Sequence, residues 1–350
     1  MRVIVGMSGG VDSAVTAYLL KMKGYEVIGV TLRIVNGENE VSRCCEIDDA
    51  RQVCETLGIP YYVHNCSSKF AACVIDPFIQ AYSEGRTPNP CVNCNRLIKW
   101  DELMRSAEVL QADYIATGHY AKIEQLPNGR YTVKNAASAQ KDQSYMLCRL
   151  SQEQLAKTLM PLGDLTKDEV RKIAEVAGLH VATKAESQDI CFVPDGDYAA
   201  FIEERTGKIF PEGDFVDTEG KVLGQHKGII NYTVGQRKGL GVAAGIPIFV
   251  MEIDAEQNKV VLTNEDGMYA LGCILKNVNY MGMEKPEENE EFDAWVKVRY
   301  HHKAIPAKVQ REGMQLFVVF SEPVKAVAPG QTGVLYDENG CVLAGGEIDR

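Results

Sequence analysis

The sequence has no apolar run that approaches the ~18 residues of a membrane-spanning helix. It also has no internal repeat, no low-complexity tract apart from one acidic stretch, and no charged and apolar leader ahead of its first strand-like residues. These absences exclude a membrane-spanning or fibrous protein, and we expect a protein of the cytoplasm. Its 350 residues are enough for two or three hydrophobic cores.

Positive charge is scarce as well, since the formal net charge is −11. Nucleic-acid partners favour basic surfaces, so this balance taken alone argues against one. However, the stretch 284–293 holds six acids and one lysine, and it therefore supplies −5 of the total. Basic residues gather at 236–238 and 299–303, where each cluster is either a solvated face or a contact to a phosphate backbone.

The eleven cysteines are an odd count in a chain without a secretion signal. A reducing compartment favours thiols, metal ligands or redox catalysts over structural disulfides. We expect most of these cysteines to be small buried hydrophobes.

The loop 8–13 follows an apolar strand pattern and leads into a helical stretch. Its two adjacent glycines let backbone N–H groups approach an anion, and the helix N-terminus adds further donors and a positive dipole end. Ser8, Asp12 and Ser13 are residue types that cap such an end. The loop therefore predicts a phosphate site, and a plain strand-to-helix turn is the alternative.

The same loop contains no lysine, whereas a kinase-type P-loop needs one to reach the terminal phosphates. Transfer of a γ-phosphate is therefore not expected. The pattern S-G-G-x-D-S resembles the PP-loop of ATP pyrophosphatases, in which the loop holds pyrophosphate as the leaving group.

Up to about residue 205, short apolar runs alternate with helical patterns, which is typical of a parallel sheet covered by helices. Strands are predicted at 3–6, 27–32, 61–63 and 114–117, helices at 48–57 and 97–110, and a helix-starting capping box at 166–169. Ligands of such sheets lie beyond the carboxyl ends of the strands. We expect the 8–13 loop, the residues after Leu32 and segment 118–120 to converge on one crevice, where ATP belongs.

From about residue 206 the pattern changes to short alternating runs broken by Gly, Asn and Pro, which is typical of β-hairpins. The predicted strands are 248–253, 260–263, 292–299, 307–310, 316–320 and 333–336. The predicted fold class is therefore α/β, with an N-terminal parallel-sheet PP-loop domain over 1–205, a small central β-containing domain over 206–268, and a C-terminal antiparallel β-barrel over 269–350.

Cys91 and Cys94 lie three residues apart, after two prolines and just before the predicted helix. A thiol near a helix N-terminus is shifted toward thiolate, which is the nucleophilic form. The spacing alone leaves open a metal site, a redox disulfide or neither. Cys191 taken alone is more simply a core residue.

Seven segments, taken together and in this order, resemble the tRNA-specific 2-thiouridylases of the MnmA type. They are G-M-S-G-G-V-D-S (6–13), G-R-T-P-N-P-x-x-x-C-N (85–95), A-T-G-H-Y (116–120), K-D-Q-S-Y (141–145), S-x-x-I-C-F (187–192), G-Q-R-K-G-L-G (235–241) and P-G-Q (329–331). The resemblance covers nearly the whole chain. It implies an enzyme that converts the wobble uridine of certain tRNAs to 2-thiouridine, using ATP and a persulfide sulfur from a donor protein.

By this resemblance, Cys94 matches the family's nucleophile and Cys191 matches the cysteine that carries the persulfide. The implied ATP-binding residues are Gly6, Met7, Ser8, Gly9, Gly10, Val11, Asp12, Ser13, Leu32 and Gly118. The implied tRNA-binding residues are Asn89, Pro90, Cys91, His119, Lys141, Asp142, Gln143, Arg299, Tyr300 and Gln331. For His119 the alternative is a hydrogen-bonded core histidine. Mg2+ is expected on the phosphates, although the sequence assigns it no protein ligand.

The sequence departs from the commoner family pattern at Cys91, where many members carry aspartate. A thiol cannot accept the hydrogen bonds that a carboxylate accepts there. Together with Cys94 and Cys191 it would also suit an iron–sulfur cluster, an alternative that we do not favour. The adjacent pair Cys44 and Cys45 has no assigned role.

Two other functions stay open at this point. One is a PP-loop ligase that adenylates a small molecule, and the paired thiols argue against it. The other is a catalytically idle tRNA-binding homologue, and the intact 8–13 loop argues against that.

Overall fold

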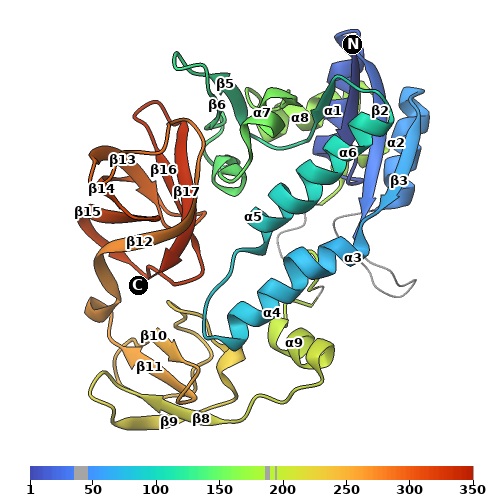
Figure 1. The fold of residues 1–350 in the computed structure, drawn as a ribbon. Coiled ribbons are helices and arrows are strands. Elements are labelled where there is room, and N and C mark those ends of the chain that lie inside the picture. Colours follow the sequence, from blue (N-terminus) through green and yellow to red (C-terminus); the bar gives the residue numbers. More distant parts are fainter. Residues whose placement is uncertain (35–45, 186–189, 194, 350) are drawn as a thin grey trace.

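The computed structural model describes residues 1–34, 46–185, 190–193 and 195–349. Figure 1 shows an N-terminal sheet with its helices, a smaller β-sheet that follows it in the chain, and a C-terminal barrel. Within the described ranges, no helix is both long enough and apolar enough to cross a membrane.

The N-terminal body is built on a parallel sheet with the strand order β3-β2-β1-β4-β7. Its strands are β1 (Arg2–Gly6), β2 (Glu26–Arg33), β3 (Tyr61–Asn65), β4 (Tyr114–Ala116) and β7 (Thr158–Leu159). The central strand β1 is apolar and its interior residues have no exposed surface, as expected for a strand covered on both faces. The four strands predicted here are confirmed, and β7 is an addition.

Helices α1 (Val11–Met22), α2 (Ile47–Leu57) and α6 (Asp101–Val109) pack against this sheet, and α8 (Lys167–Val176) packs on α1. The predicted capping box forms at the start of α8. The Thr166 hydroxyl accepts the N–H of Glu169, whose carboxylate accepts the N–H of Thr166. A short helix, α7 (Gln152–Ala156), begins with a second capping box, at Ser151.

Two longer helical rods leave the sheet toward the other two bodies (Figure 1). The first joins α3 (Ser67–Phe70) to α4 (Asp76–Ser83) through the π-helical turn Ala71–Ile75. The second joins α5 (Pro90–Cys94) to α6 through the π-helical turn Asn95–Trp100. The prediction of a helix over 97–110 was therefore wrong at its start, because Pro90 suits a first helical position and begins the rod.

The central body is a four-stranded sheet in the order β10-β11-β8-β9, which follows helix α9 (Tyr198–Thr206). Its strands are β8 (Gly213–Val216), β9 (Val222–His226), β10 (Phe249–Asp254) and β11 (Lys259–Thr263). The β10–β11 pair is the predicted antiparallel hairpin. At its core the rings of Phe215, His226 and Tyr232 stack edge to face.

The C-terminal body is a closed antiparallel barrel with the strand order β12-β15-β14-β13-β16-β17. Its strands are β12 (Tyr269–Tyr280), β13 (Glu291–Lys297), β14 (Ile305–Glu312), β15 (Gln315–Lys325), β16 (Thr332–Tyr336) and β17 (Val342–Asp349). The sequence predicted a barrel but neither β12 nor β17. A register shift after Lys276 interrupts the alternation of β12, and two glycines weaken the strand pattern of β17.

A hairpin of the N-terminal body, β5 (Lys122–Gln125) and β6 (Tyr131–Lys134), lies beside the barrel (Figure 1). The Thr132 hydroxyl donates to the carbonyl of Val342 at 2.6 Å, and the N–H of Asn135 donates to Gly340 at 3.0 Å. Arg130 donates to the carbonyls of Tyr280 and Met281. The barrel is thus attached directly to the body that carries the 8–13 loop.

Candidate functional site

The loop after β1 has the open glycine geometry of a phosphate site. Gly9 has φ +79°, and an added Cβ would lie 2.6 Å from the carbonyl oxygen of Glu46. Gly10 is the N-cap of α1, and no side-chain hydrogen bond caps this end among the described residues. The expectation that Ser8, Asp12 or Ser13 caps the helix was therefore wrong. Because no side chain caps them, the N–H groups of the first turn suit an anion.

The serines of the loop bond within the loop instead. The hydroxyls of Ser8 and Ser13 lie 3.3 Å apart, and Ser13 donates to the carbonyl of Gly10 at 3.0 Å. These contacts fix the turn, and the Ser8 hydroxyl also accepts the N–H of Gly10 at 3.4 Å. Gly6 and Met7, which lead into the loop, lie at the end of β1, where Met7 is buried and bonds β2 through its backbone.

Segment 118–120, which follows β4, lies directly against this loop. An added Cβ on Gly118 would lie 2.8 Å from the carbonyl carbon of Asp12 and from the nitrogen of Ser13. The Tyr120 hydroxyl donates to Asp12 Oδ1 at 2.7 Å. The two segments therefore meet as expected. Leu32 is buried on β2, and residues 35–45 after it lie outside the described residues.

Two lysines from distant parts of the chain reach the loop. Lys167, at the start of α8, contacts the two carboxylate oxygens of Asp12 at 2.7 and 2.9 Å. Lys184 donates to the carbonyl of Gly9 at 3.1 Å and pairs with Glu46 and Asp49. Burial lowers the pKa of Lys184. Neither lysine was predicted, because both lie far from the loop in the sequence, although Lys167 directly follows the predicted helix cap Thr166.

Cys91 lies in the first turn of α5 and Cys94 is the last residue of this helix, so neither lies ahead of the helix as predicted. Cys91 is exposed, whereas Cys94 is partly buried against the core. The N–H groups and dipole of the first helical turn favour a thiolate at Cys91, and they act less strongly at Cys94, one turn further along.

Cys191 is partly buried, and its segment packs on the α3–α4 rod. The ring of the neighbouring Phe192 lies 5.6 Å from that of Phe70 and 5.3 Å from that of Phe78, on either side of the π-helical turn. Helix α5 packs against the same turn. The segments that carry Cys94 and Cys191 therefore share one neighbouring helix.

Five other cysteines are buried, as expected for small hydrophobes. Burial raises the pKa to about 12 for Cys54, Cys148 and Cys273, and to about 11 for Cys66 and Cys341. In the part of the chain that the structure describes, no three His, Cys, Asp or Glu side chains are gathered as a metal site. Cys44 and Cys45 lie outside the described residues.

The segment ahead of α5 is held between the other two bodies. An added Cβ on Gly85 would lie 2.6 Å from the carbonyl oxygen of Ile253 in β10. On the barrel side, the N–H of Thr87 donates to Pro329 at 2.9 Å, and the Gln331 amide donates to the carbonyl of Thr87 at 3.0 Å. The motifs 85–95 and 329–331 are thus in contact with each other, and the side-chain amide of Gln331 hydrogen-bonds within the protein.

Two asparagines on either side of the cysteine pair, Asn89 and Asn95, contact the turn Ser144–Leu147. The Asn89 amide lies 3.6 Å from the sulfur of Met146, and the Asn95 amide donates to its carbonyl at 3.0 Å. The other amide atom of Asn95, Oδ1, is buried without a hydrogen-bond partner in the structure. Pro90, the remaining predicted residue here, is buried as the first residue of α5.

His119 is a half-buried residue with a defined partner. Its Nδ1 lies 2.8 Å from the Thr117 hydroxyl, and its ring lies 5.4 Å from that of Trp100. Burial and the nearby charge of Lys99 hold its pKa well below the usual range. Both effects favour the neutral form of His119.

Segment 141–143 is tied into the protein by its last two residues. Asp142 is 7% exposed, and its carboxylate accepts the N–H of Ala136 at 2.9 Å and the hydroxyl of Ser144 at 2.8 Å. Gln143 makes two hydrogen bonds to the backbone of Tyr120, both at 2.9 Å. Its side-chain oxygen accepts the N–H of Tyr120, and its own backbone N–H donates to the carbonyl of Tyr120. Lys141 is partly exposed.

Arg299 lies at the junction of the barrel and the central body. Its guanidinium donates to the carbonyls of Ala326 at 3.1 Å and Val234 at 2.7 Å, and burial lowers its pKa. The ring of Tyr300 lies 6.0 Å from that of Tyr145. The exposed cations of the two basic clusters are instead Arg237, Lys238 and Lys303.

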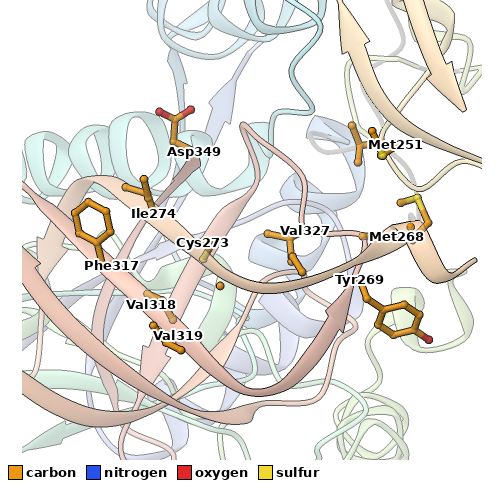
Figure 2. A pocket seen from close by; sticks show the side chains of 15 residues that line it. Met251, Met268, Tyr269, Cys273, Ile274, Phe317, Val318, Val319, Val327 and Asp349 are labelled. Atoms are coloured by element: carbon orange, nitrogen blue, oxygen red, sulfur yellow. The ribbon is translucent and has the colours of Figure 1, made fainter. Parts of the chain in front are cut away.

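An apolar groove of about 560 Å³ lies where the barrel meets the central body (Figure 2). Figure 2 shows Met251 and Met268 on one side and Phe317 on the other. None of the predicted site residues lines it, and its apolar walls do not suit a polyphosphate. The groove is therefore separate from the candidate site.

Three family profiles match successive parts of the chain. They are described as tRNA methyl transferase HUP domain over 1–195, tRNA methyl transferase PRC-barrel domain over 199–264, and Aminomethyltransferase beta-barrel domain over 271–348.

Curated relatives match over the full length of the chain. The tRNA-specific 2-thiouridylase MnmA of Lachnoclostridium phytofermentans is 50% identical over 99% of this chain and 99% of its own. The protein of the same name from Clostridioides difficile is 46% identical over 100% and 98%, and that from Acetivibrio thermocellus is 48% identical over 99% and 98%.

Proposed function

The chain belongs to the family of tRNA-specific 2-thiouridylases, and from this membership we infer that it replaces the 2-oxygen of the wobble uridine of tRNA by sulfur, with ATP as its second substrate. The observation that carries this inference is the uncapped glycine loop at α1, with Gly118 packed against it and Lys167 and Lys184 beside it. That geometry suits a pyrophosphate held by backbone N–H groups and cations.

The uracil 2-oxygen is a poor leaving group, so it is activated first. Its attack on the α-phosphorus of ATP forms an adenylate and releases pyrophosphate into the 8–13 loop. Lys184 and Lys167 are the cations that would share the charge of this leaving group with the Mg2+ that ATP brings. Gly9 and Gly118 support this role, because a side chain at either position would collide with the surrounding backbone.

Sulfur transfer is assigned to the two thiols named above. A donor protein leaves a persulfide on Cys191, and the outer sulfur attacks C2 of the adenylated uridine, from which AMP departs. Cys94, as a thiolate, attacks the inner sulfur, so that the outer sulfur stays on C2 and a Cys94–Cys191 disulfide forms. A two-electron thiol reductant then restores both cysteines for the next turnover.

The tRNA would lie across the bodies that meet at this site. We propose the division into 1–205, 206–268 and 269–350, with the exposed cations Arg237, Lys238 and Lys303 supplying contacts to the phosphate backbone. Asp142 and Arg299 would act indirectly, because their polar atoms already bond the protein. We place the activity in the cytoplasm, where its tRNA substrate occurs.

The two thiols provide the test. Cys94→Ser and Cys191→Ser should each abolish 2-thiouridine formation from tRNA, Mg-ATP and a persulfide donor, while ATP and tRNA still bind. The matched control is Cys273→Ser, which alters a buried barrel thiol and should thiolate normally. Nucleoside mass spectrometry of the digested tRNA measures the product, and wild-type thiolation by Cys191→Ser would contradict the assignment.

A further inference from the structure

Tyr120 joins the nucleotide loop to segment 141–143 through its side chain on one side and its backbone on the other. Its hydroxyl donates to Asp12 Oδ1 at 2.7 Å, in the first turn of α1. Its backbone N–H donates to Gln143 Oε1, and its carbonyl accepts the N–H of Gln143, both at 2.9 Å. Tyr120 is 3% exposed, so water does not compete freely for these bonds.

The same chain of bonds continues from segment 141–143 into the barrel. The hydroxyl of Ser144 donates to Asp142 at 2.8 Å and lies 3.2 Å from the Tyr336 hydroxyl of β16. Lys297 of β13 lies 3.9 Å from the Asp142 carboxylate. A shift of the barrel relative to the N-terminal body would therefore be felt at Gln143 and, through Tyr120, at Asp12.

Asp12 is the point at which this chain of bonds meets the phosphate machinery. Its carboxylate is shared between the Tyr120 hydroxyl and the amino group of Lys167. A polyphosphate bound beside the loop would compete with Asp12 for the amino group of Lys167, so the balance between these two partners would depend on the nucleotide. The same balance depends on segment 141–143, because that segment holds the backbone of Tyr120.

We propose that Tyr120 is a positioning residue that couples tRNA binding to nucleotide binding through its hydroxyl bond to Asp12. The proposal rests on the proposed function, since it takes segment 141–143 and the barrel as the side on which tRNA binds. Coupling of this kind is reciprocal: tRNA tightens nucleotide binding by the same factor by which nucleotide tightens tRNA binding.

The test is Tyr120→Phe, which removes the hydroxyl and keeps the ring. The dissociation constant of the full-length protein for tRNA is measured with and without saturating α,β-methylene-ATP, which cannot be cleaved between its α and β phosphates. In the wild type we expect the analogue to tighten tRNA binding by about tenfold, within the ~5–150-fold range usual for such coupling. In Tyr120→Phe we expect a factor below about two, with each separate affinity within about threefold of wild type.

A matched control is Tyr198→Phe, which removes a partly buried hydroxyl that lies 3.3 Å from the Thr233 hydroxyl in the central body. It should keep the wild-type coupling factor. If Tyr120→Phe also keeps that factor, the role of Tyr120 is refuted. If the factor falls only because the protein has lost both separate affinities, the residue is structural and the proposal is again wrong.

The outcome is distinguishable from failure of the proposed function. A wild-type protein that thiolates tRNA but shows no coupling factor overturns only this inference. A wild-type protein that binds nucleotide but neither binds nor thiolates tRNA overturns the proposed function as well. A second readout, the affinity for α,β-methylene-ATP with and without tRNA, should show the same loss of coupling in Tyr120→Phe, because the coupling of the two binding steps is reciprocal.

Discussion

Replacing Gly118 by alanine should disable the nucleotide site through a single methyl group. Gly118 is not among the residues with positive φ, so alanine meets no conformational penalty of its own. Its Cβ would lie 2.8 Å from the carbonyl carbon of Asp12 and from the nitrogen of Ser13, and both of these are backbone atoms that cannot rotate away. The loop or segment 118–120 must therefore move.

Overpacking of this kind costs about 1–3 kcal/mol. If the loop relieves the strain by leaving its ATP-binding shape, the affinity for ATP falls by about 5- to 150-fold, since 1.4 kcal/mol is a factor of ten. Titration calorimetry with Mg-ATP measures this affinity, and urea unfolding measures the accompanying loss of stability. Binding of tRNA in the absence of nucleotide should change much less.

A matched control is Gly224→Ala in β9, where an added Cβ would make only an ordinary contact at 3.5 Å with Val242. This variant should bind ATP as the wild type does. If Gly118→Ala also binds ATP within twofold of wild type, the nucleotide does not require the observed packing of segment 118–120 on the loop. The site would then have to be placed elsewhere.

Three further predictions concern Lys184, His226 and the cysteines. Lys184→Met should weaken product inhibition by pyrophosphate by about ten- to a hundredfold, because it removes a charged hydrogen-bond donor from the loop. Lys184→Arg should restore most of this inhibition. If pyrophosphate inhibits Lys184→Met as strongly as the wild type, the lysine does not bind pyrophosphate. Burial lowers the pKa of His226 in the folded protein, so as the pH falls this histidine is protonated in the unfolded chain before it is protonated in the folded one. Between pH 7 and pH 5, this group should therefore lower the free energy of unfolding by at most about 1.4 kcal/mol per pH unit. His226→Gln should flatten that slope in urea unfolding, and an equal slope would contradict this. At about pH 8 a maleimide should label the exposed Cys91 well before Cys54, Cys148 or Cys273, as peptide mass spectrometry would report; equal labelling of the folded protein would contradict their burial.

The sequence predicted the elements whose patterns are local and regular. The core strands of the parallel sheet, the capping box at Thr166 and the hairpin of β10 and β11 all carry their signal within a few residues. The strands β12 and β17 do not. A register shift breaks the alternation of β12. In β17, a glycine stands at position 345 because the side chain of Cys148 fills the space that a larger residue there would need.

The start of the second rod shows a different limit of sequence reasoning. Two prolines and a cysteine pair indicate a loop when they are read along the chain, yet Pro90 is the first residue of the helix. Pro90 suits that first position, and tertiary contacts fix the segment ahead of it. The segment before Pro90 is fixed by Pro329 and Gln331 of the barrel and by Ile253 of β10, and none of these lies near it in the sequence.

The candidate site divides in the same way. The glycine loop and segment 118–120 were predicted because motifs and strand order place both at one edge of the sheet. Lys167 and Lys184 could not be found in this way, since 155 and 175 residues separate them from their partners in the loop. Arg299 was assigned to tRNA by resemblance, and the burial of its guanidinium between two carbonyls appears only in three dimensions.

The central claim is that one molecule of ATP is cleaved between its α and β phosphates for each uridine thiolated. It is tested most directly by incubating the protein with tRNA, a persulfide donor and ATP labelled at the α-phosphate, and by counting AMP against 2-thiouridine in the same sample. The account predicts one AMP for each 2-thiouridine, and pyrophosphate as the other product. Labelled ADP in place of AMP, or AMP without 2-thiouridine, would contradict it.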